Sequence, residues 1–477
     1  MLFDIKGFGD KVALVEGERS CTYRELDEIS SGIASAAGDA RLAFLLCENH
    51  IEAIAGYLAF VNNGIVPMLL DAEIDGALLC NLMELYRPEL IWKPESRDVD
   101  LAGASRLLEC GSYALFDRGV ADPYELNPGL TLLMSTSGST GTSKLVRLSQ
   151  DNIVSNTEAI IEYLGITSED RAITSLPMSY VYGLSVIQTH LAAGATLVLT
   201  DSACYEGRFW KLFDKERCTS FAGVPFMYEM LDKLRFAKKV PPATLKTMTQ
   251  AGGHLSVALQ EKFARWAKEY GIDFFVMYGA SEATARMGYL PPDRSLDKIG
   301  SAGIAIPGGC FEIAGKDGIP LGIGEIGELA YRGPNVSMGY ATCGEDLAKG
   351  DENNGYLLTG DMARMDDEGF VYIVGRKKRF VKILGKRTNL EEVEELIKAH
   401  LGVTDVACGG HDDLLRVFLV DAALSEAAKA FVHEKMGINE KLVDTVIVDE
   451  ILKNASGKTL YAELDRIAEE GAGDGAR

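Results

Sequence analysis

The chain is poor in basic residues, and its cysteines form no pairing pattern. Its 477 residues include 48 Lys and Arg against 70 Asp and Glu, a formal net charge of −22. Because so acidic a surface repels nucleic acid and anionic lipid, we expect neither as a main partner. The nine cysteines are odd in number and include no C-x-x-C pair. This excludes a zinc ribbon and a fully paired disulfide scaffold, and it is typical of a reducing compartment.

Long apolar segments are missing as well. No run of eighteen apolar residues occurs, and the N-terminus lacks the basic and then apolar pattern of a signal peptide. We therefore expect a cytoplasmic protein without a membrane partner. The composition is 47% hydrophobic and 25% charged, as in globular proteins. The length allows one large domain and a smaller one.

Short apolar runs alternate with helical patterns through most of the chain. Residues 42–47, 196–199 and 274–277 read as strands, and the segment 255–270 has apolar residues at helical spacing before Gly271. This alternation predicts an α/β fold of mainly parallel sheets flanked by helices. In such folds, functional residues gather where the strands end.

One strand, predicted at residues 130–134, runs into a segment rich in hydroxyl groups and glycine, residues 135–144 (STSGSTGTSK). Glycine lets the backbone turn successive N–H groups inward, which creates a concave anion-binding surface. Lys144 adds a mobile positive charge suited to phosphate. A flexible linker would not lie between this strand and the apolar residues that follow. The segment is a phosphate loop, but not of the Walker type, because Gly141 and Lys144 are not adjacent.

Five further motifs follow this loop, at residues 250–254 (QAGGH), 277–284 (MYGASEAT), 356–361 (YLLTGD), 375–387 (GRKKRFVKILGKR) and 454–458 (NASGK). Together the six resemble, in kind and order, the signatures of the adenylate-forming (AMP-binding) superfamily of acyl-CoA synthetases, peptide-synthetase adenylation domains and luciferases. The resemblance implies a large N-terminal domain and a small mobile α+β C-terminal domain. We assign these to residues 1–375 and 376–477, with a hinge near 376–378 and a frayed tail at 467–477.

The resemblance also implies the residues that bind ATP and catalyse the reaction. Lys458, Glu282 and Lys144 are the expected catalytic residues, and Glu282 is the expected Mg²⁺ ligand because a carboxylate oxygen suits this ion. The expected ATP-binding residues are Thr136, Ser137, Gly138, Ser139, Thr140, Gly141, Lys144, Gly252, Gly253, Tyr278, Gly279, Ala280, Ser281, Asp361 and Arg376. Asp361 would bind the ribose hydroxyls.

The acid and the acceptor thiol have their own candidate residues. The acid pocket is expected around Tyr180, Tyr182, Gly223 and Val224, although either tyrosine could instead be part of the core. Tyr180 stands where amino-acid-activating members of the family have an aspartate, and an ammonium buried without a counter-charge is costly. Acids without an α-amino group are therefore expected. Lys378 matches the hinge position, and Gly385 and Lys382 lie on the thiol-acceptor side.

These features predict an AMP-forming acid–thiol ligase. It would activate a small non-amino carboxylic acid as acyl-AMP, release pyrophosphate, and transfer the acyl group to a pantetheine thiol. The thiol could belong to CoA or to a carrier protein, and the sequence does not separate the two. Two alternatives are an acyl-adenylate:amine ligase and a catalytically idle AMP-binding protein. The presence of Lys144, Glu282, Asp361 and Lys458 argues against the idle protein.

Overall fold

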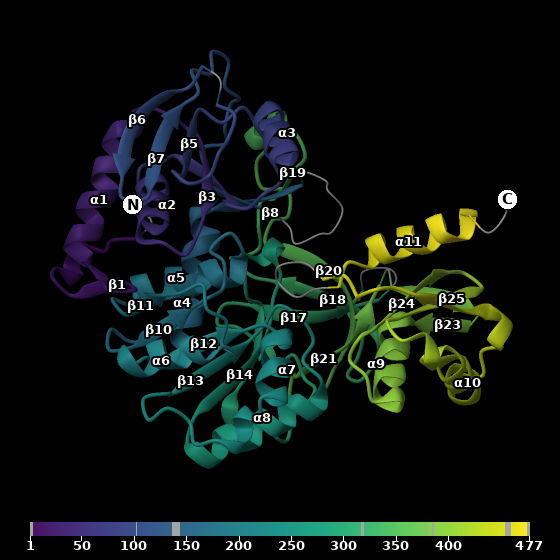
Figure 1. Cartoon of the computed structure of the whole chain (residues 1–477). Coiled ribbons are helices and arrows are strands. Elements are labelled where there is room, and N and C mark those ends of the chain that lie inside the picture. The colour runs from purple at the N-terminus through teal and green to yellow at the C-terminus, as the bar shows by residue number, and fades with distance from the viewer. Residues whose placement is uncertain are drawn as a thin grey trace. The chain divides into compact units, whose positions relative to one another are not determined.

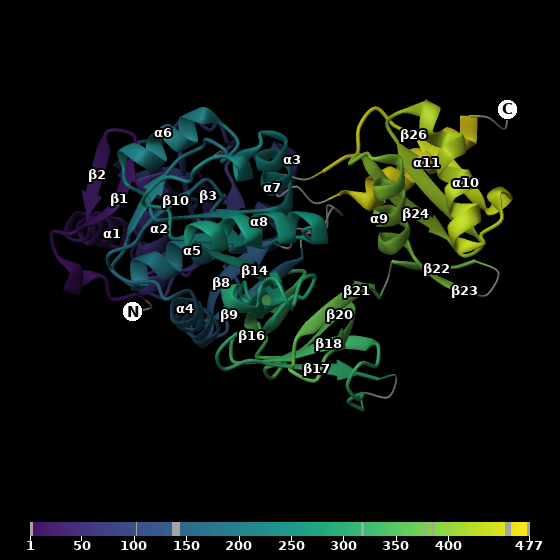
Figure 2. The same cartoon turned by 90° about the horizontal axis from the view of Figure 1, so that it is seen from below.

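The computed structural model describes residues 3–101, 103–135, 144–315, 319–377, 379–383, 386–453 and 459–474 (Figures 1 and 2). The chain divides into two compact units. The first comprises mainly Met1–Thr136, Thr142–Phe311 and Tyr331–Leu357, and the second mainly Glu312–Ala330 and Leu358–Arg477. The predicted boundary at residue 375 therefore falls inside the second unit, whose final stretch begins at Leu358. Hinge motion near 376–378 stays a prediction.

The first unit contains a large, mainly parallel sheet. Its middle strands pair in parallel, and antiparallel strands close both edges. In spatial order the strands are β16 (Ile304–Ala305), β15 (Gly288–Leu290), β14 (Asp273–Tyr278), β13 (Thr247–Gln250), β12 (Ser220–Gly223), β10 (Arg171–Thr174), β11 (Thr196–Leu199), β1 (Val12–Glu16) and β2 (Arg19–Thr22).

A second sheet of this unit carries the strand that leads into the predicted phosphate loop. Its central strands β8, β4, β3 and β5 are parallel. The spatial order is β19 (Gly339–Ala341), β9 (Leu145–Ser149), β8 (Leu130–Ser135), β4 (Val66–Asp71), β3 (Leu42–Cys47), β5 (Leu90–Pro94), β7 (Tyr113–Asp117) and β6 (Ser105–Cys110).

Helices cover both sheets of the first unit. Side chains of α1, α2, α4 and α5 are buried in a core that both sheets share, while α3 packs on the other face of the second sheet. Successive side chains of β3 point to opposite faces of the sheet. Leu45 is buried in the core that both sheets share, and Phe44 is buried in the core on the α3 side. The helices are α1 (Tyr23–Ala37), α2 (Ile51–Asn62), α3 (Gly76–Tyr86), α4 (Gln150–Leu164), α5 (Val181–Ala192), α6 (Gly207–Lys215), α7 (Pro225–Lys233) and α8 (Val257–Tyr270).

The second unit has smaller sheets and its own core. Most of a four-stranded sheet belongs to it, together with a hairpin and a three-stranded sheet packed on α9 and α10. The elements are β17 (Cys310–Ala314), β18 (Gly327–Arg332), β20 (Tyr356–Met365), β21 (Val371–Arg376), β22 (Phe380–Ile383), β23 (Lys386–Asn389), α9 (Leu390–Leu401), β24 (Val406–His411), β25 (Leu414–Leu419), α10 (Ser425–Met436), β26 (Val443–Ile447) and α11 (Tyr461–Asp474).

The α/β class agrees with the sequence prediction, and so do the strands and the helix that were predicted from local patterns. The predicted strands at 42–47 and 196–199 are β3 and β11, and the helix predicted over 255–270 is α8, which ends at Gly271 with left-handed backbone (φ 66°). The predicted frayed tail differs, because α11 continues to Asp474. Leu464 and Ala468 explain this difference, since both are buried in a small apolar cluster with Ala407 and Phe418. None of the described helices is long and apolar enough to cross a membrane.

Candidate active site

Lys144 and Glu282, two of the predicted catalytic residues, are joined through a tyrosine that the sequence did not single out. The Lys144 ammonium lies 3.3 Å from the centroid of the Tyr340 ring, and the Tyr340 hydroxyl donates a 2.7 Å hydrogen bond to Glu282 Oε1. The half-buried Tyr340 has its pKa raised, first by burial and then by the Glu282 carboxylate. The phenol therefore stays protonated and acts as a donor.

The Glu282 carboxylate is suited to bind Mg²⁺. Tyr340 occupies Oε1, while no described residue donates to Oε2 or forms an ion pair with this half-buried carboxylate. Mg²⁺ usually takes one or two protein carboxylates and fills its other positions with water and phosphate oxygens. Glu282 Oε2 could therefore be one of the protein ligands of such an ion. When bound, the ion would neutralise phosphate charge.

The loop that carries Glu282 is held by its backbone and by neighbouring side chains. Thr284 has left-handed backbone (φ 68°), which is unusual for a β-branched residue. Its hydroxyl donates to the carbonyl of Asn335 (2.7 Å), and the Asn335 side chain donates to the carbonyl of Ala283 (2.9 Å). The Glu282 carbonyl accepts the Ser337 N–H at 2.9 Å. These bonds fix the turn just after strand β14.

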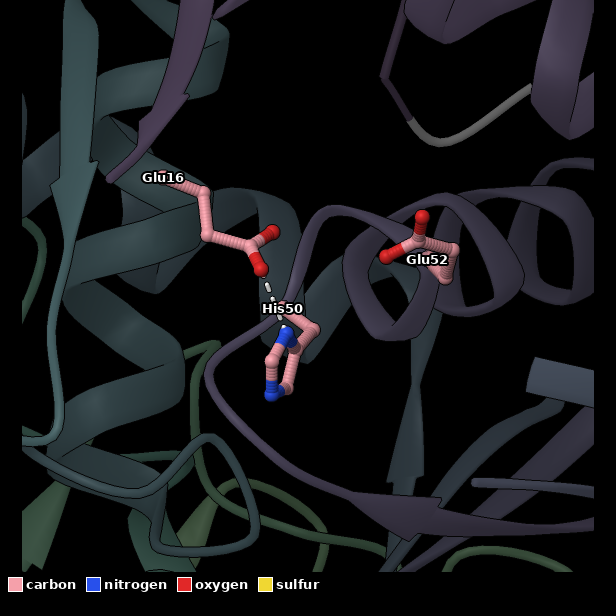
Figure 3. A group of neighbouring side chains, drawn as sticks. All are labelled: Glu16, His50 and Glu52. Atoms are coloured by element: carbon pink, nitrogen blue, oxygen red, sulfur yellow. Dashed lines mark hydrogen bonds and ion pairs between the residues drawn. The ribbon is translucent and has the colours of Figure 1, made fainter. Parts of the chain in front are cut away.

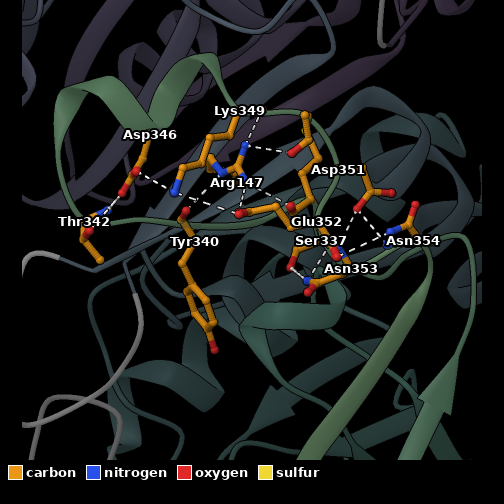
Figure 4. Close-up of polar contacts among 12 residues, drawn as sticks. Arg147, Ser337, Tyr340, Thr342, Asp346, Lys349, Asp351, Glu352, Asn353 and Asn354 are labelled. Carbon is orange, nitrogen blue, oxygen red and sulfur yellow. Dashed lines mark hydrogen bonds and ion pairs between the residues drawn. The ribbon is translucent and has the colours of Figure 1, made fainter.

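The strand that carries Tyr340 is held by Arg147, a fully buried residue of β9 (Figure 4). Its guanidinium donates to the carbonyls of Met338 (3.0 Å), Tyr340 (3.1 Å), Gly350 (3.1 Å) and Lys349 and to the Glu352 carboxylate (2.6 Å). Nearby, Asp346 accepts from Thr342 and Lys349, which holds the pKa of Asp346 well below its usual range. We call Arg147 and the carbonyls and carboxylate that it bonds the Arg147 clamp.

Two of the predicted ATP-binding segments lie at the carboxyl ends of β13 and β14. Gly252 has positive φ (+89°), and a Cβ there would meet the Tyr180 hydroxyl at 2.5 Å. A Cβ on Gly279 would meet the carbonyl oxygen of Ala285 at 1.8 Å, so only glycine fits at either position. Tyr278 is half-buried with its ring 6.2 Å from that of Phe311. Gly253, Ala280 and Ser281 lie beside these residues in the same two loops.

The four predicted acid-pocket residues come together, but the two tyrosines differ. Tyr180 is partly exposed next to Gly252, and burial of most of the side chain raises its pKa to about 12. Tyr182 is 3% exposed, and its hydroxyl lies 2.7 Å from that of Thr249. Tyr182 is therefore a core residue whose ring packs edge-on against Tyr180, with centroids 6.4 Å apart. Gly223 and Val224 are buried at the end of β12.

Among the residues that the structure describes, three predicted site residues belong to the second unit. Asp361 on β20 is 4% exposed and forms a 2.7 Å ion pair with Arg376, its partner across the β20–β21 ladder. The structure thus pairs the residue predicted to bind the ribose with a predicted ribose or phosphate contact. Lys382 on β22 has an exposed side chain, and its N–H donates to Asp412.

The remaining predicted site residues lie outside the described residues: Thr136, Ser137, Gly138, Ser139, Thr140, Gly141, Lys378, Gly385 and Lys458. The residues of this site that sequence reasoning missed are Tyr340 and Arg147. A charged residue inside the apolar run 145–148 was the available signal for Arg147.

A second group of ligand-type side chains lies elsewhere in the first unit (Figure 3). Ligand atoms of Glu16, His50 and Glu52 lie within 4.8 Å of one another. His50 Nδ1 is 2.6 Å from Glu16, and the Glu16 contact raises the pKa of His50. Arg19 binds Glu52 at 2.5 Å and lies 3.9 Å from Glu16. Because a guanidinium already neutralises these carboxylates, we interpret the group as an ion-pair network.

Comparison with known proteins places these loops in a family context. The family described as "AMP-binding enzyme" matches residues 4–341. The 2-succinylbenzoate–CoA ligase of Bacillus velezensis is 27% identical over 487 residues, covering 96% of this chain and 95% of that protein.

Two solved structures share the fold. The o-succinylbenzoate CoA synthetase (MenE) of Bacillus subtilis, in complex with its acyl-adenylate intermediate, has a TM-score of 0.80 at 22% identity and covers 96% of this chain and 97% of that chain. ATP-bound MatB from Rhodopseudomonas palustris has a TM-score of 0.75 at 22% identity, with 96% of each chain covered.

Proposed function

Because this chain belongs to the AMP-binding enzyme family, we propose that the Lys144–Tyr340–Glu282 group serves the adenylation of a small carboxylic acid. Family membership and the curated relatives confirm the predicted class, an AMP-forming acid–thiol ligase that uses ATP. In the first half-reaction, a carboxylate oxygen of the acid attacks the α-phosphorus of ATP and pyrophosphate leaves. In the second, a thiol sulfur attacks the acyl carbon, AMP leaves, and the thiol proton passes to solvent.

The observation that carries the proposal is the hydrogen bond from Tyr340 to Glu282, with Lys144 over the same ring. These contacts place a cation over the ring of Tyr340 and a carboxylate suited to Mg²⁺ at its hydroxyl. Adenylation brings two anions together, so it needs positive charge and oriented donors around the phosphates. We assign Lys144 to the leaving phosphates and Glu282 to Mg²⁺.

The second unit and the undescribed segments have proposed roles of their own. Asp361 would accept the ribose hydroxyls, with Arg376 beside it. Lys458 would bridge the acid carboxylate and the α-phosphate, since a lysine is a compact charge on a long stem. Lys378 would be the pivot, and Gly385 and Lys382 would face the thiol.

For the acceptor we propose CoA rather than a carrier protein, because the curated relatives are named as CoA ligases. For the acid we propose one without an α-amino group. Tyr180 carries no charge near neutral pH, since its pKa is raised to about 12, so it offers nothing to balance an ammonium. The cytoplasmic location predicted from the sequence stays a prediction.

Acid-dependent exchange of labelled pyrophosphate into ATP tests this function. The panel should contain short aliphatic acids, aromatic acids, 2-succinylbenzoate, and α-amino acids as a matched set. We expect exchange with one or more non-amino acids, AMP as the nucleotide product, and a thioester when CoA is added. Release of ADP, or preferred exchange with an α-amino acid, would contradict the proposal.

The roles proposed for Lys458 and Lys378 can be tested separately. Lys458→Ala should lower the rate of adenylation roughly a hundred- to a thousandfold and spare thioester formation from synthetic acyl-AMP. Lys378→Pro fixes φ near −65° and should do the reverse. Lys441→Ala, at an exposed lysine of the same unit, is the control. Equal loss of both half-reactions in both variants would argue against domain alternation.

A further inference from the structure

Arg379 connects two parts of the second unit that the proposed function uses. In sequence it directly follows Lys378, the proposed pivot, and its guanidinium carbon lies 3.3 Å from the centroid of the Tyr461 ring. Tyr461 is the first residue of α11. It stands three positions after Lys458, the lysine proposed to act in adenylation. Arg379 therefore joins the chain next to the pivot to the chain that leads out of the 454–458 motif.

The guanidinium of Arg379 is held in place along its edge. Its Nη2 donates to the Cys408 carbonyl on β24 at 3.0 Å and lies 3.4 Å from the Glu394 carboxylate on α9. Its Nε lies 3.6 Å from the Glu391 carboxylate, and the side chain is only 15% exposed. An arginine that is fixed in this way presents its flat face to an aromatic ring, a contact for which the planar guanidinium is better suited than the lysine ammonium.

Tyr461 is fixed as well. Its side chain packs against the apolar cluster that holds α11, and its hydroxyl donates to the Glu394 carboxylate at 3.3 Å. Burial raises the pKa of Tyr461 to about 12, so the phenol is neutral near pH 7. Arg379, Glu394 and Tyr461 thus form a closed group in which each side chain contacts the other two.

The residues on either side of the 454–458 motif pair with each other. Lys453 and Thr459 form an antiparallel bridge. Lys458 lies outside the described residues, but Thr459 follows it directly in the chain. Because Tyr461 is only two residues further along, the contact that fixes Tyr461 also restricts where the bridge can lie.

We propose that Arg379 is a positioning residue for adenylation, and that it acts through Tyr461 on the segment that carries Lys458. The proposal rests on the proposed adenylation function and adds to it the side chain that fixes the base of this segment. A lysine has a long flexible stem, so the place of its backbone decides which atoms its ammonium reaches. Misplacement of a reacting group by about 1 Å can cost roughly a hundredfold in rate.

Arg379→Ala tests the proposal in the two half-reactions. We expect kcat of acid-dependent pyrophosphate exchange to fall about ten- to a hundredfold, with the KM values for ATP and the acid within about threefold of wild type. Thioester formation from synthetic acyl-AMP should also stay within about threefold. Arg466→Ala is the matched control, because Arg466 lies on the same helix as Tyr461 with its side chain 65% exposed. Unchanged pyrophosphate exchange in Arg379→Ala, or equal loss of both half-reactions, would overturn the proposal.

Two variants of Tyr461 test the route of the effect. Tyr461→Phe keeps the ring under the guanidinium and should leave kcat of pyrophosphate exchange within about threefold of wild type. Tyr461→Leu removes the ring and should reproduce the loss seen in Arg379→Ala. Wild-type kcat in Tyr461→Leu would show that Arg379 does not act through this ring, which would overturn the proposal.

A double variant tests whether the effect reaches Lys458. In the Lys458→Ala background, Arg379→Ala should slow pyrophosphate exchange by less than about threefold further, because the group that it positions is already missing. Losses that multiply in full would overturn the proposal and leave the adenylation function intact. A wild-type enzyme without pyrophosphate exchange for any acid would instead reject the adenylation function, and with it this role.

Amide hydrogen exchange gives a readout that does not depend on activity. The Leu460 N–H donates to the Leu452 carbonyl at 2.9 Å, next to the Lys453–Thr459 bridge. We expect this amide to exchange faster in Arg379→Ala than in wild type, and at the wild-type rate in Arg466→Ala. An unchanged rate in Arg379→Ala would show that the arginine does not hold this segment, and the proposal would fail whatever the enzyme's activity.

Discussion

Two buried arginines of the first unit have opposite surroundings. The guanidinium of Arg147 is surrounded by four backbone carbonyls and the Glu352 carboxylate. The guanidinium of Arg286 touches two hydroxyls, a sulfur and an aromatic ring, and its Nε–H is unpartnered. Both are at most 2% exposed.

The difference lies in how completely the fold satisfies the hydrogen bonds of each guanidinium. Five acceptors that converge on one guanidinium satisfy it within the fold, and they fix the chain at residues 338–352 around Tyr340. Burial alone therefore does not tell how fully a buried guanidinium is hydrogen-bonded.

The largest expected effect comes from making the same substitution at both positions. Arg147→Met removes the clamp and leaves buried carbonyls without donors, so we expect the free energy of unfolding to fall by about 3 kcal/mol or more. Arg286→Met removes an uncompensated charge and should change it by less than about 1 kcal/mol, or raise it. Urea unfolding of the two variants measures both. Equal destabilisation would remove the distinction between the two arginines.

As the pH falls, the stability that depends on neutral His190 should be lost before the stability that depends on ionised Asp346. His190 has its pKa lowered by burial to about 4 in the fold, against about 6.5 in the unfolded chain. The unfolded state therefore binds the proton first, and about 3 kcal/mol of stability is lost as pH falls from 6.5 to 4. Asp346 has a lowered pKa, so its contribution is lost only below its unfolded value of 3.8.

The pH dependence of unfolding in wild type and His190→Gln measures this difference. We expect the variant to lack the loss between pH 6.5 and 4, and Asp346→Asn to keep it. A loss of equal size in His190→Gln would mean that other groups cause it.

The smallest expected effect is that of Tyr340→Phe, which tests the Tyr340 hydroxyl in adenylation without disturbing the Arg147 clamp. Tyr340→Phe keeps the ring under Lys144 and the carbonyl that Arg147 binds, but it removes the hydroxyl that bonds Glu282. A hydrogen bond to a charged group contributes about 1.5 kcal/mol, so adenylation should slow roughly tenfold while stability is nearly unchanged. Steady-state pyrophosphate exchange at varied Mg²⁺ checks this. An unchanged rate would show that the Tyr340 hydroxyl plays no part in the reaction.

The sequence predicted what local patterns can encode. The strand and helix periods at 42–47, 196–199 and 255–270 reappear as β3, β11 and α8, because apolar spacing and a glycine stop signal act within a few residues. Gly252 and Gly279 were found because each belongs to a contiguous sequence motif. In the structure they are positions where a side chain would clash.

What could not be predicted depends on distant contacts. Tyr340 lies 58 residues from Glu282 in sequence, and the clamp joins residue 147 to residues 338–352. Tyr182 was predicted to belong either to the acid pocket or to the core, and the structure buries its side chain with the hydroxyl 2.7 Å from that of Thr249. The helix α11 extends to Asp474, into the predicted tail 467–477, and Leu464 and Ala468 of this helix are buried against residues more than forty positions earlier in the chain.

The central claim, adenylation followed by thiol transfer, can be tested most directly by following one oxygen atom. An acid labelled with ¹⁸O in its reacting carboxylate, identified by the exchange panel, is converted with ATP and CoA, and the nucleotide product is analysed by mass spectrometry. If the carboxylate attacks the α-phosphorus and sulfur then displaces AMP, one ¹⁸O atom ends in the phosphate of AMP. Label in inorganic phosphate with ADP as the product, or thioester formed with unlabelled AMP, would contradict the account.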